Sequence, residues 1–164
     1  MMRRAPWLLA FALLACDPVQ RDAVAALGGE TNGTRPGPLH RAGQPCLLCH
    51  DGALGDPQEF SVAGTVFVMP DDKTPAVSAA VNITAADQTK KTFTTNAAGN
   101  FYVTASQWRP AFPLQVSVEY RGQTLDMDST VGRDGACAAC HADPASSDSP
   151  GHVYAVSVDG GVAP

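Results

Sequence analysis

The pattern of apolar and polar residues changes near residue 60. Beyond that point apolar and polar residues alternate in short runs, most clearly at Leu114, Val116 and Val118. Alternation with a period of two is typical of β-strands that are buried on one face. The other runs lie at 62–68, 81–83, around Phe93, and at 101–103, 125–127 and 152–158. This pattern predicts about seven short strands.

Turn-forming residues separate these runs, at 70–72, 96–99 and 121–122. Proline, aspartate, asparagine and glycine at such places favour tight turns between neighbouring strands. Short strands joined in this way predict a mainly β fold, and more specifically a small antiparallel β-sandwich. The chain is long enough for one domain with a modest core.

The segment before the strands has a different composition. Residues 16–44 are rich in glycine and proline, and only 23–27 shows a short apolar run. Such a composition predicts a flexible tether with room for one helical turn.

The N-terminus has the pattern of an export signal. Arg3 and Arg4 precede an apolar stretch at 5–15, which is too short to span a membrane. The sequence Leu13-Leu14-Ala15-Cys16 resembles the lipobox of bacterial lipoproteins. That resemblance implies cleavage after residue 15 and lipidation of Cys16, which would anchor the exported protein in the bacterial cell envelope, in the periplasm or on the outer surface. An ordinary signal peptide with an incidental cysteine is the alternative.

Removal of residues 1–15 changes the formal net charge from −5 to −7, because it removes Arg3 and Arg4 and no acidic residue. An acidic chain does not fit nucleic-acid binding. It either favours basic partners or only keeps the protein soluble.

Two copies of one motif stand out. Cys46-Leu47-Leu48-Cys49-His50 and Cys137-Ala138-Ala139-Cys140-His141 both read Cys-x-x-Cys-His, the attachment signature of c-type haem. Together they use four of the five cysteines, and Cys16 is the fifth. The chain thus resembles a dihaem c-type cytochrome. This resemblance implies two covalently attached haems, with thioether bonds to the cysteines of each motif and with His50 and His141 as the proximal iron ligands.

Two other interpretations of the cysteine pairs remain open. Four cysteines can form a tetrahedral zinc site. Zinc-binding pairs usually lie about 15–20 residues apart, whereas the gap from Cys49 to Cys137 is much longer. Two redox-active dithiols or disulfides are the other possibility.

The remaining histidines, His40 and His152, are candidate distal iron ligands, since one for each haem would give bis-histidine ligation. Met127 is the rival distal ligand, because methionine as a sixth ligand raises the potential of a haem. The sequence does not assign either histidine to a particular haem.

A second resemblance concerns the strands. The segments 62–66, 80–83 and 94–101 resemble the carboxypeptidase regulatory-like, transthyretin-like sandwich, although Ala79 stands where that family often has glycine. The resemblance implies a non-catalytic module at 60–130. The haem-binding segments, 45–59 and 131–152, would then lie at the periphery of the sandwich, and 153–164 would hold the last strand.

These observations predict an extracytoplasmic, lipid-anchored electron carrier rather than an enzyme, with other redox proteins of the cell envelope as partners. A cell-surface binding or assembly module with zinc or disulfides at the cysteine pairs is one alternative. A haem enzyme or gas sensor with an open iron site is the other.

Overall fold

The computed structural model describes residues 18–30, 33–53 and 58–157. The predicted signal segment 1–15 and the lipidation site Cys16 lie outside these described residues. The described elements are α1 (Pro18–Ala26), the 3₁₀ turns η1 (Cys46–Leu48) and η2 (Cys137–Ala139), and the strands β1 (Phe60–Phe67), β2 (Ala80–Thr84), β3 (Lys90–Thr94), β4 (Asn100–Thr104), β5 (Gln115–Tyr120), β6 (Gln123–Asp126) and β7 (Val153–Tyr154). In the described ranges, no helix combines the length and apolar character needed to cross a membrane.

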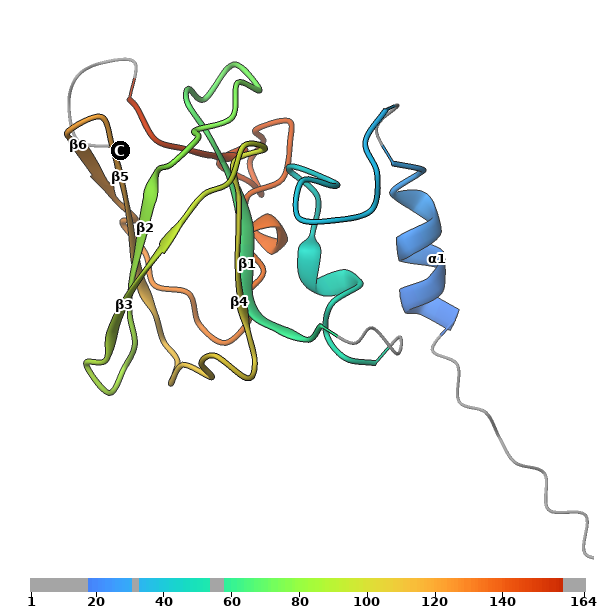
Figure 1. Ribbon diagram of the computed structural model, residues 1–164, viewed down its shortest axis with the longest axis horizontal. Coiled ribbons are helices and arrows are strands. Elements are labelled where there is room, and N and C mark those ends of the chain that lie inside the picture. The colour runs from blue at the N-terminus through green and yellow to red at the C-terminus, as the bar shows by residue number, and fades with distance from the viewer. Residues whose placement is uncertain (1–17, 31–32, 54–57, 158–164) are drawn as a thin grey trace, which may run out of the picture.

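The strands form two small sheets, with the orders β4-β1-β7 and β3-β2-β5-β6. Figure 1 shows the four-stranded sheet on one side, the three-stranded sheet in the middle, and η1 and α1 beyond it. The prediction of a mainly β fold of sandwich type is therefore confirmed.

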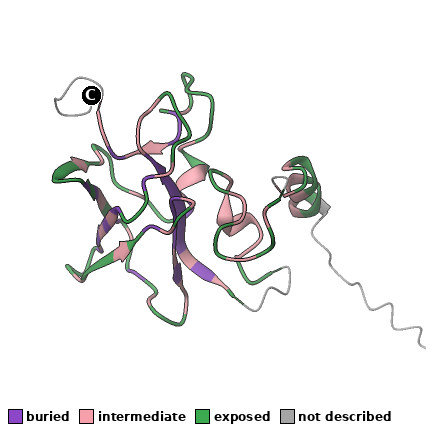
Figure 2. Ribbon diagram, turned by 45° about the horizontal axis from the view of Figure 1, so that its top comes forward, coloured by how far each residue is buried: buried purple, intermediate pink, exposed green. Residues whose placement is uncertain are grey.

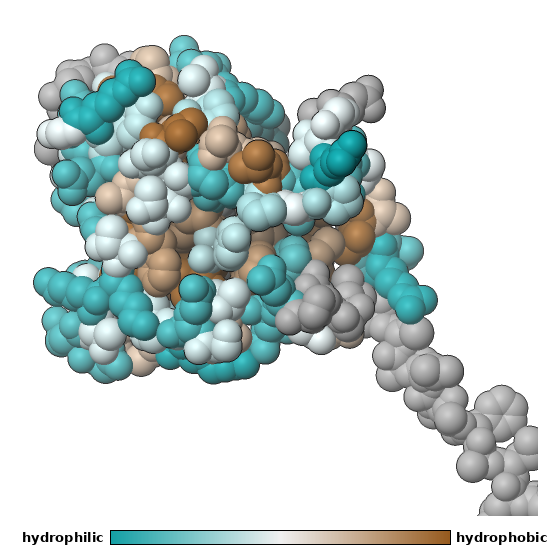
Figure 3. All heavy atoms as spheres, in the orientation of Figure 1, coloured by the Kyte–Doolittle hydropathy of each residue, from teal (hydrophilic) through white to brown (hydrophobic). Residues whose placement is uncertain are grey.

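The core lies between the two sheets. Its fully buried side chains include Val66 and Val103 from the three-stranded sheet, and Val81 and Ile83 from the four-stranded sheet. In β2 buried residues alternate with half-buried ones, as the period-two pattern predicts. Figure 3 shows apolar residues gathered between the sheets, while hydrophilic residues cover the outer edges.

Strand β1 departs from this alternation. Every residue in it except Ser61 is buried, and it forms the long, mostly buried ribbon at the centre of Figure 2. One face of β1 packs in the core, and the other is covered by the chain around the two Cys-x-x-Cys-His motifs. A strand covered on both faces needs apolar or small residues throughout, as in the sequence of β1.

The last strand also differs from the prediction. β7 pairs with β1 in parallel, through Val66 with Val153 and Phe67 with Tyr154, whereas an antiparallel arrangement was predicted. The long excursion through the second motif removes the constraint that a short hairpin places on strand direction.

The described part of the predicted tether is folded against the sandwich. In α1, Gln20 Nε2 donates to the carbonyl of Leu48 at 2.9 Å, beside the first motif. Closer to the motif, the amide of Gly43 donates to Thr65 Oγ1 at 2.8 Å, and Asn100 Nδ2 donates to the carbonyl of His40 at 3.0 Å. Polar groups on strands far away in the sequence hold this segment in place. The glycine- and proline-rich composition of the segment itself gives no sign of these partners, so the sequence predicted a flexible tether.

Candidate functional site

The two Cys-x-x-Cys-His motifs adopt the same backbone conformation. Each is a 3₁₀ turn preceded by an extended residue, Pro45 at φ −72° and ψ 92°, and Ala136 at φ −80° and ψ 102°. Each ends on its second cysteine, Cys49 at φ −104° and ψ −29°, and Cys140 at φ −110° and ψ −33°. Two segments that are distant in sequence thus form one repeated local structure.

Backbone hydrogen bonds close each turn in the same way. The carbonyl of Cys46 accepts from the amides of Cys49 at 3.2 Å and His50 at 3.0 Å. The carbonyl of Cys137 accepts from Cys140 at 3.2 Å and from His141 at 2.9 Å. These bonds hold two thiols and one imidazole together within each turn.

The two motif histidines are also oriented in the same way. His50 Nδ1 lies 3.1 Å from the carbonyl oxygen of Gln58, and His141 Nδ1 lies 3.0 Å from that of Gly151. Because a carbonyl oxygen only accepts, each Nδ1 carries a proton and donates, a tautomer that in the neutral ring puts the lone pair on Nε2. Histidines that bind metals commonly have their other nitrogen fixed in this way. Sequence reasoning missed these two carbonyl partners, which have no sequence signal.

The first motif packs against the beginning of β1. The ring of His50 stacks on Phe60 with the centroids 4.3 Å apart, and Phe60 stacks in turn on Tyr102 at 4.8 Å. The amide of Phe60 donates to the carbonyl of His50 at 2.8 Å. Apolar and aromatic residues of the three-stranded sheet thus support the first histidine.

The second motif packs against the middle of the same strand. The amide of Ala63 donates to the carbonyl of Gly135 at 2.9 Å, so the chain entering the motif pairs with β1. Cys137 then lies over Gly64, where a Cβ atom would come within 2.7 Å of the cysteine side chain. A glycine at position 64 makes this close approach possible.

Burial affects the thiols of both motifs. It raises the pKa of Cys46 to about 11, with a smaller contribution from the neighbouring Cys49. It raises the pKa of Cys137 to about 12, and the charge of Cys46 adds to this effect, so these two thiols interact electrostatically. Both are protonated at neutral pH. Redox-active dithiols usually have a lowered pKa, so this environment does not favour the dithiol interpretation.

The described residues also bear on the zinc interpretation. Among them, no three His, Cys, Asp or Glu side chains are grouped so that they could hold a metal ion. None of the four motif cysteines is joined to another in a disulfide. In this structure the two cysteine pairs do not converge on the tetrahedral arrangement that a four-cysteine zinc site requires.

A cavity of about 350 Å³ opens beside the first motif. It is lined by residues of the described tether, the first motif and the three-stranded sheet: Leu27, Gly37, Pro38, His40, Arg41, Gln44, Pro45, Cys46, Cys49, His50, Gln58, Phe60, Asn100, Phe101 and Tyr102. The rings of His40 and His50 have centroids 5.9 Å apart and planes 21° apart. The structure therefore brings the candidate distal ligand His40 together with the first motif.

His152 has a different environment. Its side chain is 7% exposed, its Nδ1 lies 2.8 Å from Asp143 Oδ1, and its Nε2 lies 2.9 Å from the carbonyl oxygen of Met69. Although its partial burial acts to raise the pKa of Asp143, hydrogen bonds from His152 and Lys73 lower that pKa overall. Nothing in the sequence indicates this pairing. Iron binding through His152 would require one of its ring nitrogens to leave Asp143 or the Met69 carbonyl.

The rival ligand Met127 lies away from both motifs. It follows β6 in the four-stranded sheet, where its amide donates to the carbonyl of Val116 at 3.0 Å. Both motifs pack against β1 in the other sheet. The structure does not bring Met127 to either candidate site.

Comparison with known proteins gives no match among family models, curated proteins or solved structures.

Proposed function

We propose that this chain is an extracytoplasmic, lipid-anchored dihaem c-type cytochrome that acts in electron transfer. The observation that carries the proposal is the repeated motif geometry, in which both turns and both Nδ1–carbonyl contacts agree. Zinc sites and dithiols give no reason for a histidine directly after each cysteine pair whose Nδ1 is fixed by a backbone carbonyl.

The cavity beside the first motif supports a haem there. Cavities of about 300–1,000 Å³ with a mostly apolar lining are typical of ligand and cofactor sites, and the cavity beside the first motif falls in this range. Cys46 and Cys49 at its wall would hold the porphyrin through thioethers, while His50 would bind the iron. Phe60 and Tyr102 would shield that histidine from one side. A bound haem supplies one-electron chemistry, and the protein sets its ligation and burial.

His40 is the proposed distal ligand of the first haem. The rings of His40 and His50 have centroids 5.9 Å apart and line the same cavity, so the two histidines could hold one iron together. The amide of Gly37 donates to His40 Nδ1 at 3.1 Å, which leaves the proton of the neutral ring on Nε2. Ligation through Nε2 therefore requires the ring to release Gly37 and move its proton to Nδ1.

The second motif would hold its haem through Cys137 and Cys140, with His141 as proximal ligand. Its turn matches the first, and Gly151 fixes the histidine. Both motifs rest on β1. Attachment along one strand favours two neighbouring haems and electron exchange between them.

The cellular setting of the proposal comes from the sequence. Lipidation of Cys16 would hold the protein in the cell envelope. Its net charge of −5 in the full chain favours docking with basic redox partners.

Haem counting tests the proposal. The full chain, exported in a host that attaches c-type haem, is expected to carry two haems by intact mass and by the pyridine haemochrome spectrum. The double variants Cys46→Ser/Cys49→Ser and Cys137→Ser/Cys140→Ser should each retain one. A folded but colourless protein would exclude the cytochrome function.

A further inference from the structure

The two motifs differ in the histidine that lies beside each of them. His40 lines the cavity of the first motif, with its ring 5.9 Å from that of His50. Near the second motif, the remaining histidine of the chain is His152, which is held in a separate network. This difference has a consequence for the second iron, provided that the proposed function is correct.

His152 connects three parts of the chain. Its Nε2 lies against the Met69 carbonyl after β1, its Nδ1 lies against Asp143 just after the second motif, and its ring packs on Phe67 at 4.6 Å. Asp143 also pairs with Lys73 at 3.2 Å. This network clamps the end of β1 to the second motif.

Iron binding would break the clamp. Both ring nitrogens of His152 lie against oxygen atoms, so iron binding through either nitrogen would displace one of these two contacts. Release of either nitrogen would take a hydrogen-bond partner from the Met69 carbonyl or from the Asp143 carboxylate. In this structure His152 therefore connects β1 to the second motif through both of its ring nitrogens.

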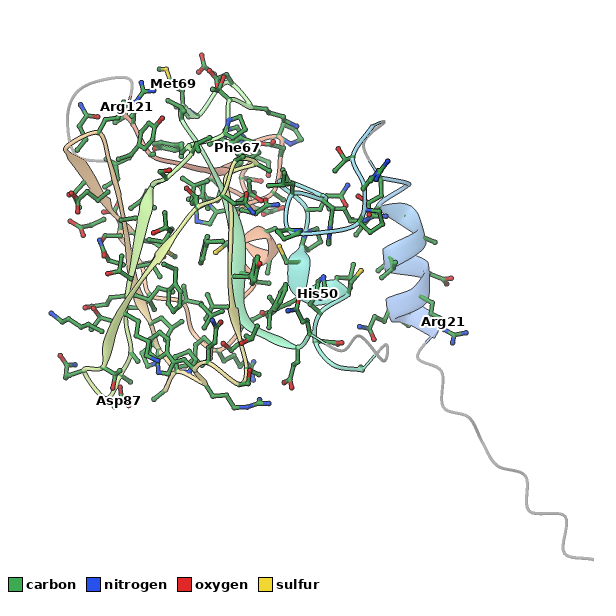
Figure 4. All side chains as sticks on the ribbon, viewed as in Figure 1. Arg21, His50, Phe67, Met69, Asp87 and Arg121 are labelled. Carbon is green, nitrogen blue, oxygen red and sulfur yellow. The ribbon has the colours of Figure 1, made fainter. Side chains whose placement is uncertain are left out.

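The methionines do not replace it. Met127 lies in the four-stranded sheet, and Met69 contributes its carbonyl to the clamp. Figure 4 shows the Met69 side chain beyond Phe67, near the end of β1, pointing away from the fold. In the described ranges the chain has no other methionine and no further histidine.

The second motif also borders solvent. Cys140 is exposed, and so is nearly all of the segment that follows His141 as far as Asp148. A haem held by His141 would therefore lie at the surface, without the cavity walls that surround the first motif.

We propose that the two irons differ: His40 closes the first, whereas the second keeps an exchangeable sixth position that binds neutral diatomic ligands in the ferrous state. The identity and access of the distal side decide whether a haem binds such ligands or only transfers electrons. The second motif is thus a small-molecule binding site within an electron carrier.

Carbon monoxide titration of the reduced protein, after its haems have been counted, tests this inference. We expect one carbon monoxide for every two haems in the wild type. The Cys46→Ser/Cys49→Ser variant should bind one per haem, and the Cys137→Ser/Cys140→Ser variant should bind none. A wild type with two haems that binds no carbon monoxide, or two, would overturn the inference. A protein without haem would instead overturn the proposed function.

Histidine variants assign the sites. His40→Ala is expected to raise binding from one to two carbon monoxide molecules per protein, and His152→Ala to leave it at one. His152→Gln retains a donor toward Met69 and serves where the alanine variant does not fold. A gain of a second binding site in either His152 variant would show that His152 ligates iron, and would contradict the inference.

Discussion

Gly64 and Cys137 meet where the second motif crosses β1, and a Cβ atom on Gly64 would lie 2.7 Å from both Cβ and Sγ of Cys137. Gly64→Ala should therefore push the second motif away from the strand. Overpacking of a buried contact costs typically about 1–3 kcal/mol. We expect a loss of this size in the free energy of unfolding, measured with denaturant, together with reduced haem attachment at the second motif only.

Gly132→Ala is the matched control for this variant. Gly132 lies in the segment of the second motif, five residues before Cys137, and a Cβ atom at Gly132 would have no heavy atom of another residue within 4 Å. Its effect on unfolding should stay within about 0.5 kcal/mol. Equal losses in the two variants would show that the contact between Gly64 and Cys137 does not matter.

Asn100 holds the loop that contains His40. It is 7% exposed, and its Nδ2 donates to the carbonyls of Pro38 at 3.2 Å and His40 at 3.0 Å. Asn100→Ala leaves the His40 carbonyl without this donor and Thr65 Oγ1 without its acceptor, while Pro38 keeps its bond from Asn96; we expect a cost of about 1–3 kcal/mol. Hydrogen exchange should speed up at 33–45 and remain unchanged in β2.

Asn82→Ala provides the comparison for Asn100→Ala. Asn82 lies in β2 of the other sheet and accepts from Thr92 Oγ1 at the surface. Unfolding should change by no more than about 0.5 kcal/mol, and exchange at 33–45 should stay as in the wild type. Faster exchange there in both variants would exclude a specific role of Asn100.

The motif thiols should differ in reactivity when no haem is attached. Burial raises the pKa of Cys137 to about 12, whereas Cys140 is exposed. The thiolate is the reactive form, so iodoacetamide at neutral pH should modify Cys140 well before Cys137. Raising the pH from 9 toward 12 should progressively deprotonate Cys137 and so increase its rate of modification. Peptide mass spectrometry measures both rates, and equal rates at neutral pH would contradict this description.

Two valines separate core packing from surface effects. Val66 in β1 is 0% exposed, whereas Val77 is 44% exposed. Val66→Ala should lower the free energy of unfolding by roughly 2–3 kcal/mol, from lost burial and the cavity left behind. Val77→Ala should cost about 0.5 kcal/mol or less. Similar losses would place Val66 outside the packed core.

The fold class could be predicted from the sequence because local alternation determines which residues face the core. It is clearest in β2, where Val81 and Ile83 are buried and Asn82 is not. The covered outer face of β1 could not be predicted, since it depends on segments distant in sequence. The parallel pairing of β7 with β1 could not be predicted either, because the two strands are also distant in sequence.

The candidate site was predictable in part. The motifs identify their own cysteines and histidines, because that chemistry lies within five adjacent residues. The distinction between His40 and His152 depends on partners far along the chain, such as Met69, which lies 83 residues from His152. No local pattern encodes these contacts.

One strand supports both motifs, and this limits how the protein can be divided. Phe60, Ala63 and Gly64 of β1 each contact the motif segments, within a strand of eight residues. A chain cut into two halves with one motif each would leave one half without its supporting surface. The two motifs therefore form a single unit for engineering, and β1 cannot be redesigned for one of them without changing the other.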